Sequence, residues 1–233
     1  MTEPGVPAAD LPTGPWQETA HLYLGHLLRG AELDAILLAE AKVLVRYDLG
    51  PFYDQVLTPA LREVGRLWEA GSITVAAEHR ASAIARRTCD ALFHLLVPFR
   101  RTRGRAIISA ATSDAHDLGA RILADLLAGA GWDVTFLGAR TSERELLSLI
   151  RHGHPHVLGL SLALPSDLGQ TRALIERVRQ EPGAGDRMLI VGGPLFATDP
   201  ELWRTLGADA YAPSAQAAIA VLEAWWRTFT GAC

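Results

Sequence analysis

The chain has 233 residues and a formal net charge of −4. This length is enough for one large or two small domains, each with a hydrophobic core. Without a surplus of basic residues the chain has no electrostatic basis for direct binding of DNA or RNA, and its apolar runs are too short to cross a bilayer. Its two cysteines, Cys89 and Cys233, are far apart, which fits a reducing compartment and excludes a cysteine metal cluster. We therefore expect a cytoplasmic protein of two domains.

The N-terminal part predicts a short tail followed by helices. Residues 1–14 are rich in Pro, Gly and Ala and lack the apolar core of a secretion signal, so we expect a disordered tail. Residues 15–98 carry apolar side chains at three- and four-residue spacing, which predicts a bundle of four helices. The expected helix signals are C-caps at Gly30 and Gly50, a first turn at Pro51, an interruption at Pro59, an end at Gly71 and an N-cap at Thr74.

The pattern changes after a short arginine-rich stretch, which we expect to be a solvated linker. Residues 99–233 contain the apolar runs RAIISAAT, DVTFLGA, HVLGLSLAL and RMLIVGG and a weaker fifth run, DAYAPS, each followed by a helical segment. This alternation predicts a doubly wound parallel sheet covered on both faces. The expected fold class is therefore α/β: a four-helix bundle cap followed by a Rossmann-like five-stranded parallel sheet.

The loops that follow the predicted strands contain polar and small residues. The stretch ATSDAHDLGARIL, residues 111–123, supplies Asp114, His116 and Gly119. Ser161 follows the third strand, and Gly192 and Gly193 follow the fourth. Since open parallel sheets bind ligands at the carboxyl ends of their strands, we expect these residues to share one site.

His116 is the candidate metal ligand of this site. The first loop lacks GxGxxG and is too polar for a pyrophosphate, so a dinucleotide site is not expected. A histidine that binds a metal usually donates its other ring N–H to a carboxylate, and Asp114 is suitably placed. The alternative is that His116 only caps the following helix, with its acidic neighbours exposed to solvent.

Taken together, DAHDLG, the serine and the glycine pair resemble the cobalamin-binding domain of corrinoid proteins and cobalamin-dependent enzymes. The resemblance implies that His116 is the lower cobalt ligand and that Asp114 is its carboxylate partner. It also implies that Ser161, Gly192 and Gly193 line a channel for the nucleotide tail of the cofactor. The helical half resembles the cap of such proteins, so the resemblance covers nearly the whole chain after residue 15.

The cap contains a second motif, Trp68 followed nine residues later by Glu78 and His79. It resembles the signature of CarH-type cobalamin photoreceptors, which implies that Trp68 packs on the upper ligand and that Glu78 lies near an adenosyl group. It also implies that His79 can approach the upper cobalt face after photolysis. The alternative is that Trp68 is a core residue and that Glu78 and His79 form a surface turn.

The resemblance implies a regulatory binding protein and not an enzyme. Our first hypothesis is a stand-alone light sensor in which photolysis of adenosylcobalamin changes the domain or oligomer arrangement and signals to an unknown protein partner. The sensor would be a homo-oligomer, a dimer or a tetramer. The alternative is a corrinoid carrier of a methyltransferase system. Such carriers commonly read DxHDIGKN, whereas Ala120 and Arg121 follow Gly119 here.

A variant of the first hypothesis adds biliverdin as a second chromophore. The cap resembles that of photocobilins, and it is rich in residue types that bind propionates or stack on pyrroles. These residues are Trp16, His21, Tyr23, His26, Tyr47, Tyr53, Arg86, Arg87 and His94. They could equally be ordinary residues of a helix bundle.

Overall fold

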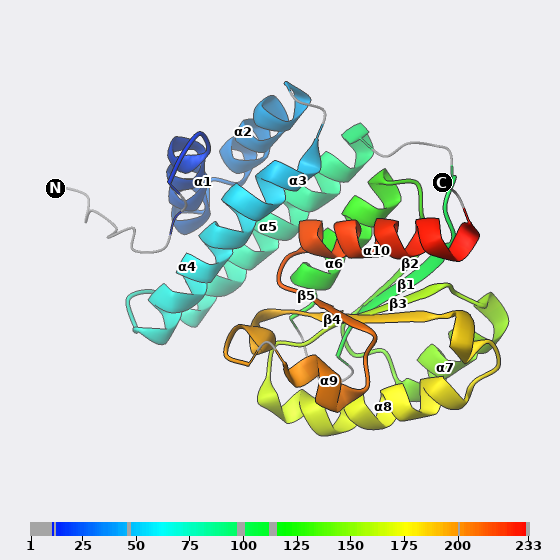
Figure 1. Cartoon of the computed structure of the whole chain (residues 1–233). Coiled ribbons are helices and arrows are strands. Elements are labelled where there is room, and N and C mark those ends of the chain that lie inside the picture. Colours follow the sequence, from blue (N-terminus) through cyan, green and yellow to red (C-terminus); the bar gives the residue numbers. More distant parts are fainter. Residues whose placement is uncertain are drawn as a thin grey trace, which may run out of the picture. The chain divides into compact units, whose positions relative to one another are not determined.

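A computed structural model describes residues 11, 13–45, 48–96, 101–111, 116–199 and 201–231. The chain divides into two compact units, Met1–Leu96 and Val97–Cys233, whose elements are labelled in Figure 1. Most of the expected tail, Tyr47 and Asp114 lie outside the described residues.

The described part of the first unit is helical. Its elements are α1 (Gln17–Arg29), α2 (Glu32–Leu44), α3 (Leu49–Phe52), the π-helical η1 (Tyr53–Leu57), α4 (Thr58–Glu69) and α5 (Val75–Leu96). Because α3, η1 and α4 follow one another without a gap, the unit consists of four successive helical segments. The expected four-helix cap is confirmed.

The helix signals are correct at two positions and wrong at a third. Gly30 ends α1 in the left-handed conformation, with φ 73°, and the Thr74 hydroxyl accepts a hydrogen bond from the Ala77 N–H at 3.2 Å. The expected C-cap at Gly50 is wrong. Asp48 accepts from the Gly50 N–H at 2.9 Å, so the next helix begins at Leu49, two residues before Pro51.

The interruption expected at Pro59 takes the form of a change in helical period. Proline has no N–H to donate to the preceding turn, so it cannot lie inside a regular α-helix without loss of a hydrogen bond. Here the π-helical segment Tyr53–Leu57 directly precedes α4, and Pro59 lies in the first turn of α4. The chain therefore remains helical from Leu49 to Glu69.

The second unit is an α/β domain. Its elements are β1 (Arg105–Ala110), α6 (Leu118–Gly129), β2 (Asp133–Gly138), α7 (Glu143–Gly153), β3 (Val157–Ser161), η2 (Pro165–Asp167), α8 (Leu168–Gln180), η3 (Ala184–Asp186), β4 (Met188–Gly192), η4 (Pro194–Ala197), α9 (Leu202–Leu206), β5 (Ala210–Ala212) and α10 (Ala215–Thr230). All neighbouring strands pair in parallel, in the order β2-β1-β3-β4-β5. The expected five-stranded parallel sheet is confirmed, including the short fifth strand.

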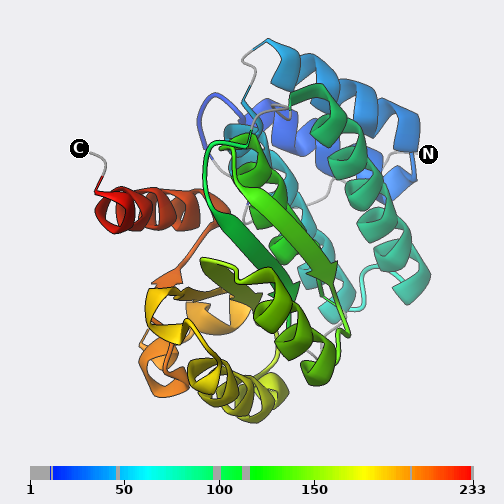
Figure 2. The ribbon, with the colours of Figure 1, turned by 90° about the vertical axis from the view of Figure 1, so that its right-hand side faces the viewer.

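Helices cover both faces of the sheet. Leu158 and Leu160 of β3 join one apolar core with α7 and α8, while Val157 joins another with α6 and α10. Both views place α8 (yellow) and α10 (red) on opposite sides of the strands (Figure 1 and Figure 2). Because successive side chains of a strand point to opposite faces, a continuous apolar strand requires this double cover.

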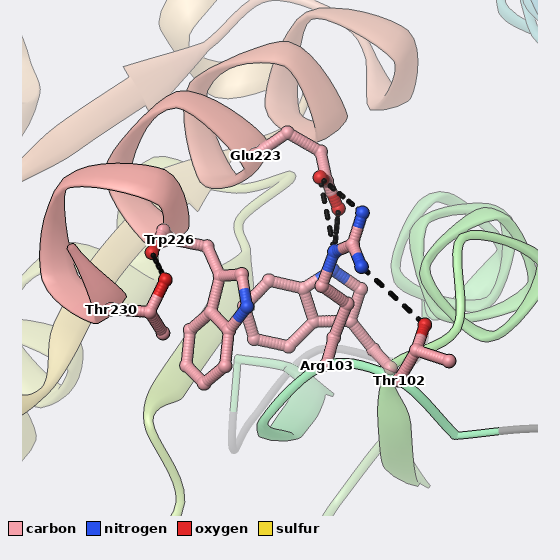
Figure 3. A network of polar contacts seen from close by, with 6 residues as sticks. Thr102, Arg103, Glu223, Trp226 and Thr230 are labelled. Atoms are coloured by element: carbon pink, nitrogen blue, oxygen red, sulfur yellow. Dashed lines mark hydrogen bonds and ion pairs between the residues drawn. The ribbon is translucent and has the colours of Figure 1, made fainter. Parts of the chain in front are cut away.

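The described arginines of the arginine-rich stretch are exposed, as expected for a solvated linker, and two of them also form ion pairs. Arg103 forms an ion pair with Glu223 of α10 at 3.1 Å, as Figure 3 shows, and Glu223 also accepts from the Trp132 indole N–H at 3.2 Å. Arg101 pairs with Asp133 at the start of β2. These contacts hold the described part of the stretch at the amino edge of the sheet.

Candidate functional site

The loops with the candidate residues meet at the carboxyl edge of the sheet. Ala110, Ser161 and Gly192 end β1, β3 and β4 and are register partners across the sheet. Beyond these pairs, the Ala111 N–H donates to the Ser161 carbonyl at 2.9 Å and the Leu162 N–H donates to the Gly192 carbonyl at 2.9 Å. The strand order reverses direction at β1 and β3, so this edge is the topological switch point at which such sheets bind ligands.

His116 lies at the entrance to α6. It is exposed and directly precedes Asp117, the N-cap residue of that helix. Three residues later, a β-carbon built on Gly119 would lie 3.4 Å from the Ser161 hydroxyl. The structure therefore places the beginning of α6 next to the end of β3. It does not describe Asp114, so its role as partner of the imidazole stays a prediction.

The fold itself explains why one position of the glycine pair is glycine. Gly193 has φ 111°, and a β-carbon there would lie 2.2 Å from the Leu162 carbonyl oxygen. A β-carbon on Gly192 would lie 3.0 Å from the Ala212 carbonyl oxygen. The fold itself therefore requires glycine at Gly193. Whether Gly192 and Gly193 also line a channel stays a prediction.

The donor set of this edge suits a metal that arrives with its own macrocycle. No cluster of three or more histidine, cysteine or carboxylate side chains is present in the part of the chain that the structure describes. His116 can offer one imidazole nitrogen, which is the kind of axial ligand that metal macrocycles take from proteins. Gly119 and Ser161 are both small, and a β-carbon on Gly119 would already contact the Ser161 hydroxyl. These residues fit a corrinoid.

The cap motif lies at one end of the first unit. Trp68 is near the end of α4, and Glu78 and His79 are in the first turn of α5, with only residues 70–74 between the two helices. The Trp68 side chain is 46% exposed, so the alternative that Trp68 is a core residue is wrong. Glu78 accepts from the Ser82 hydroxyl at 2.7 Å, and its other oxygen lies 3.6 Å from Nε2 of His79. The structure brings this acid and this imidazole together.

Several of the residues considered for a bilin belong to the packing of the bundle. Trp16, Tyr23 and Tyr53 are buried in its core. The Tyr23 hydroxyl donates to Thr88 at 3.0 Å, and burial raises the pKa of this phenol, which keeps it protonated. Arg87 forms an ion pair with Glu32 at 2.6 Å. The contacts of these residues are explained without a second chromophore.

Sequence reasoning missed one feature of the carboxyl edge. Arg140, two residues after β2, has φ 61°, and nothing in the sequence indicates this conformation.

The chain is thus an α/β protein with an exposed histidine, His116, at the switch point of its parallel sheet. A family model described as a B12 binding domain matches residues 104–222, and a second model with the same description matches residues 21–93. The chain belongs to the B12-binding family and is therefore a cobalamin-binding protein.

Relatives of two kinds are found. The chain is 31% identical over 128 residues to the HTH-type transcriptional repressor CarH of Myxococcus xanthus, which covers 55% of this chain and 42% of the repressor. It is 26% identical over 190 residues to dimethylamine corrinoid protein 1 of Methanosarcina acetivorans, which covers 80% of this chain and 88% of that protein. The chain thus spans less than half of the repressor and most of the corrinoid protein.

The fold has a counterpart among solved structures. The Methanosarcina barkeri monomethylamine corrinoid protein superposes with a TM-score of 0.75 at 20% identity, over 90% of this chain and 99% of that chain. This similarity shows that the two chains share a fold. Separately, the described residues include no helix that combines the length and apolar character needed to cross a membrane.

Proposed function

We propose that the chain is a corrinoid carrier that exchanges methyl groups with separate enzymes. The observation that carries this proposal is that the similarity to dimethylamine corrinoid protein 1 extends over 190 residues and includes most of both chains. The match to the repressor spans less than half of that protein. A carrier needs methyltransferase partners and performs no catalysis alone.

The residues of the carboxyl edge would hold the corrinoid. His116 would supply an imidazole nitrogen to cobalt, and Asp114 would accept the other ring N–H and keep the ring oriented. Ser161, with the chain around Gly192 and Gly193, would border the nucleotide tail. When bound, the corrinoid supplies a cobalt centre that can take up and give up a methyl group.

The departure from the DxHDIGKN pattern has a local explanation. Arg121 donates from Nε to the buried Asp125 at 2.7 Å, and its guanidinium lies 5.9 Å from the ring centre of Phe136. Ala120 is buried in the core of the unit. Both residues therefore serve the packing of α6, and their presence does not argue against a carrier.

Replacement of the proposed ligand tests this assignment. The His116→Ala variant should keep the fold, because His116 is exposed and lies on a loop. It should lose the absorption spectrum of imidazole-bound cobalamin and bind cobalamin more weakly. His152→Ala removes an exposed imidazole from α7 and serves as the control. An unchanged spectrum and affinity of the His116 variant would rule out His116 as the ligand.

A second candidate function is a light sensor that binds adenosylcobalamin. One observation favours it. Trp68 is exposed and shares one end of the first unit with the Glu78 and His79 pair. An exposed tryptophan contributes little to the packing of a bundle, so it is available for a ligand such as an adenosyl group. The two functions differ in their response to light and in the role of Trp68 and His79.

A further inference from the structure

Arg140 has an unusual backbone conformation. Among the described residues other than glycine, positive φ occurs at Arg140, with 61°, and at His154, with 43°. The left-handed region is unfavourable for residues with a β-carbon, because the β-carbon approaches the following carbonyl oxygen. Such residues often occur at functional sites, where the surrounding structure maintains the strain.

The conformation of His154 has a structural cause that does not apply to Arg140. His154 is the C-cap residue of α7, and its N–H donates to the Ile150 carbonyl at 3.1 Å. A left-handed residue is a common way to end a helix. Arg140 follows a strand and ends no helix. Its conformation therefore has no helix-capping cause.

The loop that carries Arg140 is attached to the candidate cobalamin site. The Ser109 hydroxyl of β1 lies 2.8 Å from the Ala110 carbonyl oxygen and 3.3 Å from the Gly138 carbonyl oxygen, and the Thr141 hydroxyl donates to the Leu137 carbonyl at 3.1 Å. A β-carbon built on Gly138 would lie 3.3 Å from a carboxylate oxygen of Asp117, the residue after His116. The loop thus lies beside the beginning of α6, at the edge where the cofactor binds.

The guanidinium of Arg140 is exposed and makes no hydrogen bond or ion pair with any residue that the structure describes. Some other arginines of this unit are paired. Arg121 pairs with Asp125, and Arg179 pairs with Asp209. A strained position therefore carries an arginine that has no role in the contacts of the folded chain.

We propose that Arg140 donates hydrogen bonds to the carbonyl oxygens of the amide side chains on the rim of bound cobalamin. This inference rests on the proposed cobalamin site. A guanidinium offers five N–H donors in a fixed plane, which suits several neutral acceptors on one rim. The cobalamin phosphate is the other acceptor to consider. The carboxylate of Asp117 beside Gly138 would repel an anion at this loop, so the neutral amides are favoured.

Glycine substitutions at the two left-handed positions test the proposal. Arg140→Gly and His154→Gly both relieve the backbone strain, and both should unfold in urea at a midpoint close to that of the wild type or above it. Only Arg140→Gly should weaken the binding of hydroxocobalamin, by about tenfold, the effect expected for the loss of a charged hydrogen-bond donor. Arg140→Lys keeps the charge but not the planar donor group. Its affinity for hydroxocobalamin should therefore lie between that of the wild type and that of Arg140→Gly.

Cobinamide, which keeps the rim amides but lacks the phosphate and the nucleotide, identifies the acceptor. The Arg140→Gly variant should lose affinity for cobinamide and for cobalamin by the same factor. A loss with cobalamin alone would assign Arg140 to the phosphate and overturn the proposal. If the wild type binds cobalamin and Arg140→Gly binds it equally well, this inference fails alone. If the wild type binds no corrinoid, the proposed function fails with it.

Discussion

His156 shows how one side chain can make the stability of the second unit depend on pH. Its Nδ1 accepts a hydrogen bond from the Arg105 N–H at 3.1 Å, and its ring lies edge-on to Trp226 at 5.2 Å. Burial and the nearby charge of Arg105 lower the pKa of His156 below its ordinary value of 6.5. Since Nδ1 is an acceptor, the folded protein holds the neutral ring.

We predict that the free energy of unfolding falls as the pH is lowered below about 6.5. A histidine whose pKa is lower in the folded than in the unfolded state stabilises the fold above the unfolded pKa. This stabilisation is lost as the pH falls toward the folded pKa, because the unfolded chain binds the proton first. Urea unfolding at pH 7.5 and at pH 5.5 measures the effect.

The same measurement on two variants separates His156 from the other titratable groups. The His156→Gln variant should lose part of the difference between the two pH values, whereas His152→Gln, on the exposed side of α7, should keep it. An equal pH dependence in the wild type and in His156→Gln would contradict the assignment.

At the scale of elements, the turn after β4 is the part of the sheet most sensitive to a single methyl group. At Gly193 a β-carbon would lie 2.2 Å from the Leu162 carbonyl oxygen, and φ is 111°. Neither backbone can move easily, because the Leu162 N–H is bonded to the Gly192 carbonyl and the Leu195 N–H to the Leu162 carbonyl. The ends of β3 and β4 are therefore fixed to each other by the turn.

We predict that Gly193→Ala lowers the free energy of unfolding of the second unit by about 3 kcal/mol or more. The control is Gly169→Ala in the first turn of α8, where no atom lies within 4 Å of a built β-carbon. That variant should remain within roughly 1 kcal/mol of the wild type. Urea unfolding measures both. If Gly193→Ala were as stable as the wild type, the turn would be able to adopt another backbone conformation, and the prediction would be wrong.

The elements show which features can be predicted from the sequence. Periodicity predicts the sheet and the helices, because β1, β3 and β4 are apolar on both faces and each helix has one apolar side. The cap at Gly50 could not be predicted reliably, since a glycine after an apolar run signals either a helix end or a turn into the next helix. The outcome here depends on Asp48, whose side chain caps α3.

At the scale of the whole molecule, sequence order was enough to group the main site residues. In a parallel sheet all the strands end at the same edge, so His116, Ser161 and Gly192 could be placed together before the fold was known. Contacts between distant residues could not be predicted. Position 193 requires glycine because the Leu162 carbonyl oxygen lies so close to it. The linker residue Arg103 is bonded to Glu223, 120 residues later.

Light distinguishes the carrier from the sensor. A sensor must bind the dark and the illuminated forms of its cofactor with different affinity, since a ligand with equal affinity for two states changes no population. Trp68 could supply this difference by packing on an adenosyl group, a contact worth roughly 0.5–1.5 kcal/mol beyond area burial. His79 could add to it by binding cobalt once the adenosyl group has left. A carrier needs neither contribution.

From the carrier proposal we predict that green light changes the adenosylcobalamin complex no more than it changes free adenosylcobalamin, and that the oligomeric state stays the same. Trp68→Ala and His79→Ala should then have wild-type spectra in darkness and in light, as should the control His21→Ala, which removes another exposed imidazole from the first unit. Absorption spectra and size-exclusion chromatography before and after illumination measure these outcomes.

The sensor would give the opposite pattern. Trp68→Ala would lose up to about tenfold of its preference for adenosylcobalamin over methylcobalamin, His79→Ala would give a water-bound product after photolysis, and the wild type would change its oligomeric state in light.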